Sequence, residues 1–402
     1  MRKLDLRTGK PVWHAYRAPS VPVAALTRDI TTEILVVGMG ISGAMMAEAL
    51  TGAGHEVVLI DRRGPLLGST PATTALVQYE IDTPLYRLKL MIGRADAERA
   101  WRRSRLAVMN LKSHVEALGI ACDLSAKPTL YLAGNELAGR ALEAEAEARR
   151  DAGILSRYMT AKPLKEEFGL ERDGAILSHD NLALDPRKLT AGLLNLARSR
   201  GARLYANVEA TTFVHGKDGV SVETASGPVI TAGHVVLCTG YELVSFVPAD
   251  NHQVISTWAL ATKPQKQNLW PQEAFIWEAS DPYLYMRATK DGRVICGGED
   301  EEFQDEERRD ALLPERIAAI RAKLKKLLPG LDTEPQFAWA GAFGSTSTGL
   351  PIIGAVPRKP RIHAIMGYGG NGITFSRIAS EIISAAIAGR SDSDADLFAF
   401  KT

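Results

Sequence analysis

Two segments, one near each end of the chain, show an apolar run followed by a glycine-rich turn and a helical pattern. In the first, residues 34–37 precede the turn 38–43, and a second apolar run, 57–60, ends at Asp61. Short apolar runs bounded by glycine are typical of strands buried in a parallel sheet, so this segment predicts a strand–helix–strand unit. Residues 361–390 repeat the order of strand, turn and helix.

Helical and strand patterns alternate between these two segments. Apolar spacing predicts helices over about 84–118, 135–151, 186–200 and 314–328, and strands over about 129–133, 235–238, 254–260 and 283–298. Residues 1–30 are rich in proline and aromatic residues and have no period of 2 or 3.6, which predicts an extended segment over the surface. Chain length alone predicts roughly two domains.

The first turn has the residues of a dinucleotide-binding motif. Gly38 allows the tight turn, Gly40 lets a pyrophosphate approach the backbone, and Gly43 lets the helix pack against the sheet. Asp61 places a carboxylate where a ribose hydroxyl would bind, and the same charge would repel a 2′-phosphate. The motif therefore indicates FAD or NAD and disfavours NADP.

Two further features favour FAD. After Asp61 an NAD-binding domain would continue with another helix and strand, whereas residues 62–82 are mostly small and polar. In the second turn, Gly367, Gly369, Gly370 and Gly372 would let the backbone and the following helix approach a flavin ring, although such a turn can also need glycine only for packing.

Composition narrows the class of partner. The 402 residues include 48 Lys and Arg and 47 Asp and Glu, a net charge of +1, so no overall field favours nucleic acid or anionic membranes. No apolar run is long enough to span a bilayer, and no signal peptide follows Met1, which predicts a cytoplasmic protein. Cys122, Cys238 and Cys296 lack metal or redox spacing, so we expect no metal site and reduced, packed thiols.

Three blocks, taken together, resemble the FAD-dependent oxidoreductases of the D-amino-acid oxidase and glycine oxidase type. They are "EILVVGMGISGAMMAEALTGAGHEVVLID", "GHVVLCTG", and "WAGAFGSTSTGLPIIG" with "IHAIMGYGGNGITFS". The Trp-containing amino-terminal stretch and Tyr285-Met286-Arg287 are most similar to the γ-glutamylputrescine oxidase branch.

The resemblance implies an α/β, two-domain fold. A Rossmann-like FAD-binding domain would comprise residues 31–85, 186–250 and 335–402. A mainly antiparallel-sheet substrate domain would be inserted as residues 86–185 and 251–334, with 1–30 as the amino-terminal segment.

The resemblance also implies a cofactor site and a substrate pocket. The expected FAD-binding residues are Gly38, Gly40, Ile41, Ser42, Gly43, Asp61, Arg62, Ser69, Thr70, Thr73, Thr74, Val208, Thr239, Gly240, Gly369, Gly370, Asn371, Gly372 and Ile373. The candidates for the substrate pocket are Arg287, Tyr283, Tyr285, Phe343 and Gln78, and the catalytic residues stay unassigned.

Two positions depart from the family pattern. Phe343 stands where relatives commonly have an arginine that binds the substrate carboxylate, which leaves Arg287 as the candidate anion-binding residue. Near the same block the sarcosine oxidase type attaches its flavin to a cysteine, whereas this chain has Ala340, Gly341 and Ala342. The resemblance therefore predicts noncovalent FAD.

The reaction that the resemblance implies is oxidation of the C–N bond of an amine or amino acid. A hydride would pass to flavin N5, the imine would hydrolyse, and oxygen or a redox partner would accept the electrons. No Ser/His/Asp order or acid–base dyad stands out, and His179 and His252 are more often structural. Two alternatives stay open: a FAD-dependent dehydrogenase of a hydroxy acid or glycerol phosphate, and a non-catalytic FAD- or NAD-binding subunit.

Overall fold

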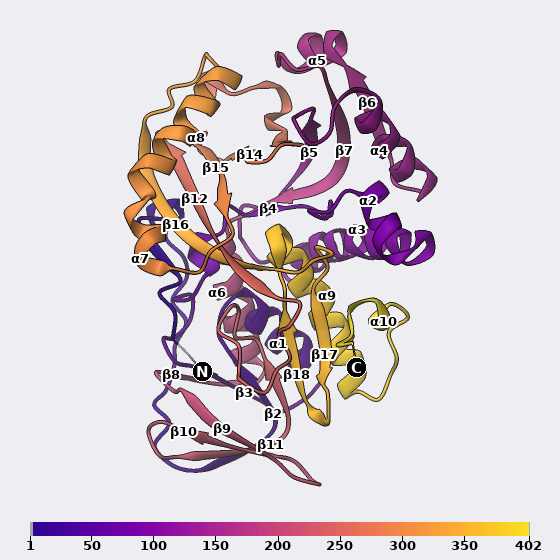
Figure 1. Cartoon of the computed structure of the whole chain (residues 1–402). Helices are drawn as coiled ribbons and strands as arrows, with labels where there is room; N and C mark the ends of the chain where they lie inside the picture. The colour runs from indigo at the N-terminus through magenta and orange to yellow at the C-terminus, as the bar shows by residue number, and fades with distance from the viewer. Residues whose placement is uncertain (1–2, 402) are drawn as a thin grey trace.

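The computed structural model describes residues 3–401 and contains two sheets, which Figure 1 shows one above the other with long helices beside them. The lower sheet is mainly parallel and the upper one mainly antiparallel. This arrangement confirms the predicted α/β, two-domain fold class. Within the described residues, no helix has the length and apolar character that crossing a bilayer requires.

The smaller sheet has the strand order β17-β18-β11-β2-β3-β8. Its strands are β2 (Ile30–Val37), β3 (Val57–Asp61), β8 (Arg203–Ala206), β11 (Val229–Leu237), β17 (Ile352–Val356) and β18 (Lys359–Met366), and β9 (Ala210–His215) and β10 (Val220–Thr224) extend from β11. The five strands from β18 to β8 run parallel to one another, and β17 and β10 pair antiparallel with β18 and β11.

Both faces of this sheet are buried, which explains its continuous apolar runs. Ile34 and Leu59 pack toward the helices α1 (Ile41–Gly52), α6 (Pro186–Ser199) and α9 (Gly372–Ile387). Leu35 and Val58 point to the opposite face and pack with apolar residues of β9 and β10. Alternate residues of a strand face opposite sides, so two covered faces require an apolar residue at every position.

The larger sheet has the order β1-β16-β12-β15-β14-β13-β5-β7-β4, with β6 beside β7. Its strands are β1 (Arg7–Gly9), β4 (Leu76–Val77), β5 (Ser125–Leu132), β6 (Ser156–Thr160), β7 (Gly174–Ala183), β12 (Gln253–Thr262), β13 (Phe275–Glu278), β14 (Leu284–Ala288), β15 (Val294–Glu301) and β16 (Pro335–Ser345). One face packs through Trp258, Leu284 and Met286 on helix α8 (Leu313–Leu327) and its neighbours. Thr257 and Tyr285, which alternate with them, face the smaller sheet's side.

The remaining helices are α2 (Leu85–Ile92), α3 (Arg94–Ala117), α4 (Gly139–Asp151), α5 (Ala161–Phe168), α7 (Glu306–Ala311) and α10 (Ala395–Phe398). Short 3₁₀ turns occur at Val12–Ala15, Thr70–Ala72, Lys266–Asn268, Pro271–Glu273 and Gly369–Asn371. The helical region that the sequence predicts over 84–118 is two helices, because Gly93 between them has a φ of +87° that an α-helix cannot contain.

Strand pairing divides the chain differently from the sequence-based domain limits at two places. β4 pairs with β7, and β16 pairs with β12, so residues 76–77 and 335–345 belong to the larger sheet. The sequence groups both segments with the cofactor domain, because each is joined by a short connection to residues of that domain. The partner strands lie far away in sequence, and no local pattern identifies them.

The first part of the amino-terminal segment is partly buried, whereas most of residues 14–29 are exposed and without regular structure, as expected for an extended surface segment. β1 pairs with β16, and Trp13 is buried with its Nε1 donating to the Thr73 carbonyl at 2.6 Å. Leu4 is held by Glu242, whose Oε1 accepts from the Leu4 amide at 2.7 Å. The segment therefore connects both sheets, because its aromatic and backbone groups find partners in each.

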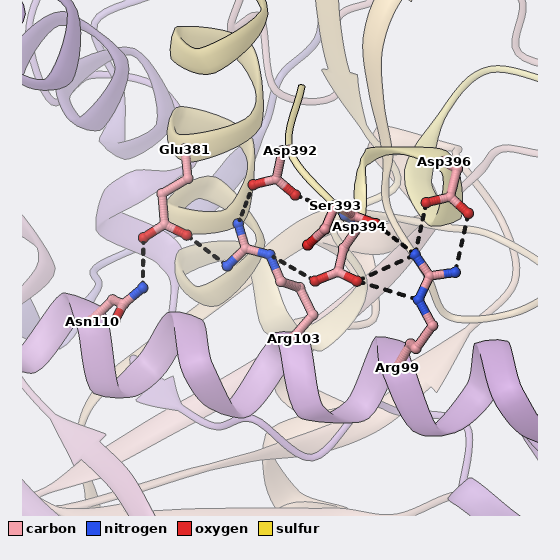
Figure 2. A network of polar contacts seen from close by, with 8 residues as sticks. All are labelled: Arg99, Arg103, Asn110, Glu381, Asp392, Ser393, Asp394 and Asp396. Carbon is pink, nitrogen blue, oxygen red and sulfur yellow. Dashed lines mark hydrogen bonds and ion pairs between the residues drawn. The ribbon is translucent and has the colours of Figure 1, made fainter. Parts of the chain in front are cut away.

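An ion-pair network fastens the carboxyl-terminal segment to α3 (Figure 2). Arg103 is buried and donates to Glu381 Oε2 at 2.6 Å and to Asp392 Oδ2 at 3.2 Å. One turn earlier, Arg99 makes a similar set of contacts with Asp394 and Asp396, but at a more exposed position. The two arginines thus offer a matched comparison of a buried and an exposed interaction.

We expect Arg103→Met to lower the free energy of unfolding by about 2–4 kcal/mol, since the change leaves partly buried carboxylates without their partner. Arg99→Met is the control and should cost less than about 1 kcal/mol, because solvent already screens its ion pairs. Urea unfolding of both variants measures the difference. Equal losses would contradict the assigned role of burial.

His363 is a buried, uncharged histidine in β18. Its ring lies 5.7 Å from that of His234, neither ring nitrogen has a hydrogen-bond partner among the described residues, and burial lowers its pKa to about 4. Because an unfolded histidine titrates near 6.5, the unfolded chain binds more protons between these two pKa values. The contribution of His363 to the free energy of unfolding is therefore fully present above about pH 6.5 and decreases as the pH falls toward 4.

His363→Leu should reduce the loss of stability between pH 7 and pH 5 by about 2 kcal/mol relative to the parent protein. Urea unfolding at both pH values gives the four free energies required. His179→Gln serves as control, because His179 is exposed and should leave the pH dependence unchanged. An undiminished pH dependence in His363→Leu would exclude the buried neutral ring as its source.

Candidate active site

The candidate cofactor residues converge on one edge of the smaller sheet. Strands β2, β11 and β18 are neighbours and parallel, so the loops 38–40, 238–240 and 367–371 meet at their carboxyl ends. A cavity of about 1690 Å³, measured with its mouth, extends from this edge to the inner face of the larger sheet. Its lining runs from Gly38 and Asp61 to Tyr283 and Tyr285, so one cavity joins the sheet edge to the larger sheet.

Close backbone packing fixes the first loop. Gly38 has a φ of +116°, and a Cβ there would lie 2.3 Å from the Cys238 carbonyl oxygen. A Cβ on Gly43 would lie 1.9 Å from the Gly38 carbonyl oxygen. Side chains at these two positions would therefore push α1 away from β2 and β11, and with it the helix end that faces the cavity.

Two helix amino termini meet at the cavity. The hydroxyls of Ser42 in α1 and Ser376 in α9 are 2.7 Å apart, which joins the first turns of both helices. The Ile41 amide donates to Thr70 Oγ1 at 3.0 Å, so the hydroxyl-rich loop lies against the same helix end. Free amides and the positive ends of two helices favour anionic groups such as a pyrophosphate.

Asp61 is held rigidly at the cavity wall. Its Oδ2 accepts from the Met39 amide at 2.8 Å, and its Oδ1 accepts from the amides of Arg63 and Gly64 at 2.7 and 2.9 Å. Arg63 in turn pairs with Glu242 at 2.6 Å. The carboxylate keeps acceptor capacity for hydroxyl groups, and its charge disfavours an additional phosphate.

Nearly all the predicted cofactor residues line this cavity. The lining set comprises Gly38, Gly40, Ile41, Ser42, Asp61, Arg62, Ser69, Thr70, Thr73, Thr74, Val208, Thr239, Gly240, Gly369, Gly370, Asn371, Gly372 and Ile373. Gly43 lies behind the wall, where it contacts Gly38. Their roles in binding stay predictions that this placement supports.

Four of the five substrate-pocket candidates lie at the other end of the cavity, under the larger sheet. Tyr283, Tyr285, Phe343 and Gln78 line it there. Tyr283 donates its hydroxyl hydrogen to Asp300 Oδ2 at 2.5 Å. Burial, together with the nearby Asp82 and Glu299 charges, raises the pKa of Asp300 to about 6, while its hydrogen bonds oppose the shift.

The structure places Arg287 outside this cavity, which corrects its assignment as the anion-binding residue of the substrate pocket. Arg287 lies two residues after Tyr285 in β14, so both side chains are on the same face of the strand. At Arg287, however, the segment that contains Trp13 covers this face. Arg287 Nη1 donates to the carbonyls of Ala75 and Leu184 at 2.6 and 3.1 Å. The side chain satisfies buried backbone acceptors and lines a separate cavity.

The sequence reasoning missed several residues that line the substrate end. These are Glu80, Asp82, Thr257 and Trp277, and Tyr368 was missed at the edge of the smaller sheet, where its ring lies 6.0 Å from that of Tyr241. The acidic residues Glu80 and Asp82 directly follow Gln78 and Tyr79, so their sequence position was a usable signal. Trp277 and Thr257 gave no local signal, because their strands reach the cavity only through the pairing of the larger sheet.

The cavity wall has the properties of a FAD site. Buried polar atoms with no hydrogen-bond partner among the described residues include Arg62 Nη2, Gln78 Nε2, Asn371 Oδ1 and the Tyr368 hydroxyl, and all four residues line the cavity. Such groups require a partner, and a polar ligand would supply it. The anion-binding helix ends, the fixed Asp61 carboxylate and the glycine turn of residues 367–372 match the pyrophosphate, ribose and ring of FAD.

The cysteine in the described wall is disfavoured as a point of covalent flavin attachment. Cys238 is the one cysteine that lines it, at the sheet edge beside Gly38. Burial raises the pKa of its thiol well above the ordinary value, so the reactive thiolate is disfavoured. Residues 3–401 contain no group of three or more His, Cys, Asp or Glu side chains that could hold a metal ion.

Comparison with known proteins agrees with this geometry. The sequence model of one family, described as FAD dependent oxidoreductase, matches residues 33–386. Gamma-glutamylputrescine oxidoreductase from Escherichia coli K12 is 25% identical over 380 residues, which cover 92% of this chain and 86% of that protein. Monomeric sarcosine oxidase from Streptomyces avermitilis is 23% identical over 382 residues, which cover 88% of this chain and 93% of that protein.

Solved structures show the same fold. The structure of glycine oxidase from Geobacillus kaustophilus superposes with a TM-score of 0.75 at 18% identity, and covers 92% of this chain and 98% of that one. L-proline dehydrogenase from P. horikoshii gives a TM-score of 0.76 at 20% identity, with 93% and 97% covered.

Gly40 and Gly43 should respond differently to substitution by alanine. A Cβ on Gly40 would lie 3.2 Å from Thr70 Oγ1, which can rotate, so Gly40→Ala should fold but bind FAD about tenfold more weakly or worse, because the methyl group obstructs the pyrophosphate path. Gly43→Ala should lose folded protein. FAD titration of apoprotein and circular dichroism measure both effects. Unchanged FAD affinity in Gly40→Ala would contradict the placement of the pyrophosphate.

Proposed function

This chain belongs to the DAO family of FAD-dependent oxidoreductases, and we propose that it oxidises the C–N bond of an amine or amino acid. The observation that carries the proposal is the single cavity with two chemically different ends. One end has the helix termini and Asp61, which suit the ADP part of FAD. The other end is roofed by aromatic and hydroxyl side chains of the larger sheet, which suit a small organic substrate.

When bound, FAD supplies a two-electron acceptor that takes a hydride from the carbon next to nitrogen, and water then converts the imine to a carbonyl compound and an amine or ammonia. The chain itself binds and orients the substrate. Tyr283 uses its hydroxyl hydrogen toward Asp300, so the lone pairs of its oxygen are available to accept an N–H of the substrate. Phe343 and Trp277 line the same end with apolar surface that excludes water.

The tyrosines bind rather than act as bases. Burial raises the pKa of Tyr285 above its ordinary value, and burial with the neighbouring Asp300 charge raises that of Tyr283 further. Both therefore stay protonated at neutral pH. The amine would enter the reaction with a free lone pair, and the protein would contribute chiefly by positioning the C–N bond.

We further propose that FAD is bound noncovalently, since the segment 340–342 has no nucleophilic side chain and the Cys238 thiol is buried at the sheet edge. Denaturation with acid should release the flavin into solution. The electron acceptor is either oxygen or a redox partner, and readmission of air to reduced protein separates the two.

Purified protein should be yellow, and an amine substrate should bleach it in the absence of air. A panel of amines, amino acids and hydroxy acids identifies the substrate class, because only oxidation of a C–N bond releases ammonia or a free amine. Bleaching by hydroxy acids alone would replace the proposal with C–O oxidation. A bound flavin that no member of the panel reduces would favour a non-catalytic role.

A further inference from the structure

The substrate end of the cavity combines carboxylates with aromatic rings. Glu80 and Asp82 line it together with the rings of Trp277, Tyr283, Tyr285 and Phe343. Among the described residues, the cations that line the cavity are Arg62 and Arg63, which lie beside Asp61 at the opposite end. The substrate end therefore carries two carboxylates and no arginine or lysine among the described residues that line it, and its unpaired donors include the neutral N–H groups of Gln78 and Trp277.

Asp82 lies directly on the carboxyl-terminal glycine turn. Its Oδ2 accepts from the Gly370 amide at 2.8 Å, and a Cβ on Gly369 would lie 2.7 Å from the same oxygen. Asp82 is exposed toward the cavity, and no described cation pairs with it. Desolvation by the surrounding protein atoms raises its pKa, and the Gly370 hydrogen bond opposes that shift.

Glu80 is a buried carboxylate deeper in the wall, and one of its two oxygens is unpaired. The residue is 2% exposed, Oε1 accepts from Asn181 at 3.2 Å, and Oε2 has no hydrogen-bond partner among the described residues. Burial raises the pKa of Glu80, and the nearby Arg149 charge, whose Nε donates to Glu145 at 2.7 Å, opposes that shift. A buried acceptor without a donor favours a ligand that brings N–H groups.

Aromatic faces complete the surroundings of a cation site. The rings of Tyr283 and Tyr285 are 5.6 Å apart and tilted by 32°, and Trp277 stacks on Tyr131 at 4.0 Å. Rings fixed in this way beside carboxylates are suited to ammonium groups, which interact with the ring faces. Asp300 adds a further negative charge behind Tyr283.

We propose that the substrate is a diamine or a related polycation, with one nitrogen in the oxidised C–N bond and a second, charged nitrogen bound by Asp82, Glu80 and the aromatic rings. The inference rests on the proposed function and narrows its substrate class. This assignment follows from the different protonation states that the two nitrogens require. The reacting nitrogen must have a free lone pair, whereas neighbouring carboxylates stabilise the protonated form, so the acidic end suits a different nitrogen.

Three four-carbon probes that differ in one end group provide the test: putrescine, butylamine and γ-aminobutyrate. Calorimetry on the FAD-loaded protein, with the flavin reduced beforehand so that no turnover occurs, measures binding. We expect putrescine to bind about tenfold more tightly than butylamine, and γ-aminobutyrate to bind most weakly. Rates of anaerobic flavin bleaching should follow the same order.

Asp82→Asn separates charge from shape, since asparagine can still accept from Gly370. The ratio of putrescine to butylamine affinity should fall toward one. Asp173→Asn is the matched control, because Asp173 is exposed and does not line the cavity. It should keep the ratio of the parent protein.

The outcomes separate this inference from the proposed function. Binding of γ-aminobutyrate as tight as that of putrescine, or an unchanged ratio in Asp82→Asn, would overturn the diamine assignment while leaving C–N oxidation in place. Selective putrescine binding without bleaching by any amine would support the cation site and count against the proposed oxidation.

Discussion

The structure depends on close backbone contact at the carboxyl edge of the parallel sheet. Gly38 lies against the Cys238 carbonyl, and Gly43 lies against Gly38, so β2, β11 and α1 approach to distances that no other residue permits. This contact directs the amino terminus of α1 into the cavity. The Ser42–Ser376 hydrogen bond adds α9, so the positive ends of both helices face the cavity. The position of the candidate cofactor site is therefore set by packing of the backbone.

The two sheets give the cavity two chemically different ends. The parallel sheet is covered on both faces, so its edge is its accessible functional part, and loops from distant parts of the sequence meet there. The antiparallel sheet is covered on its α8 face, and its other face presents Thr257, Tyr283 and Tyr285 to the cavity. Because successive residues of a strand face opposite sides, one set of side chains packs against α8 and the other set faces the cavity.

The two ends of the cavity differ in charge. Helix termini and two arginines lie at the end suited to phosphates, and carboxylates lie at the other. Phe343 and Arg287 are informative for this reason. Phe343 lines the substrate end and is uncharged. Arg287 is charged, but it lies outside the cavity and donates to backbone carbonyls. Among the described residues, those that line the substrate end include carboxylates and no arginine or lysine, which is the basis of the proposed ammonium site.

The dinucleotide motif could be predicted from glycine spacing and apolar runs, which are local in the chain. The resemblance to a known family added the fold class and the residues expected at the cofactor wall. Strand alternation indicated Tyr283 and Tyr285, and Phe343 was indicated by a departure from the family pattern. The placement of Arg287, the participation of Trp277 and Thr257, and the pairing of β4 and β16 were decided only by the tertiary structure. Each depends on which strand lies beside which, and such contacts join residues far apart in the sequence.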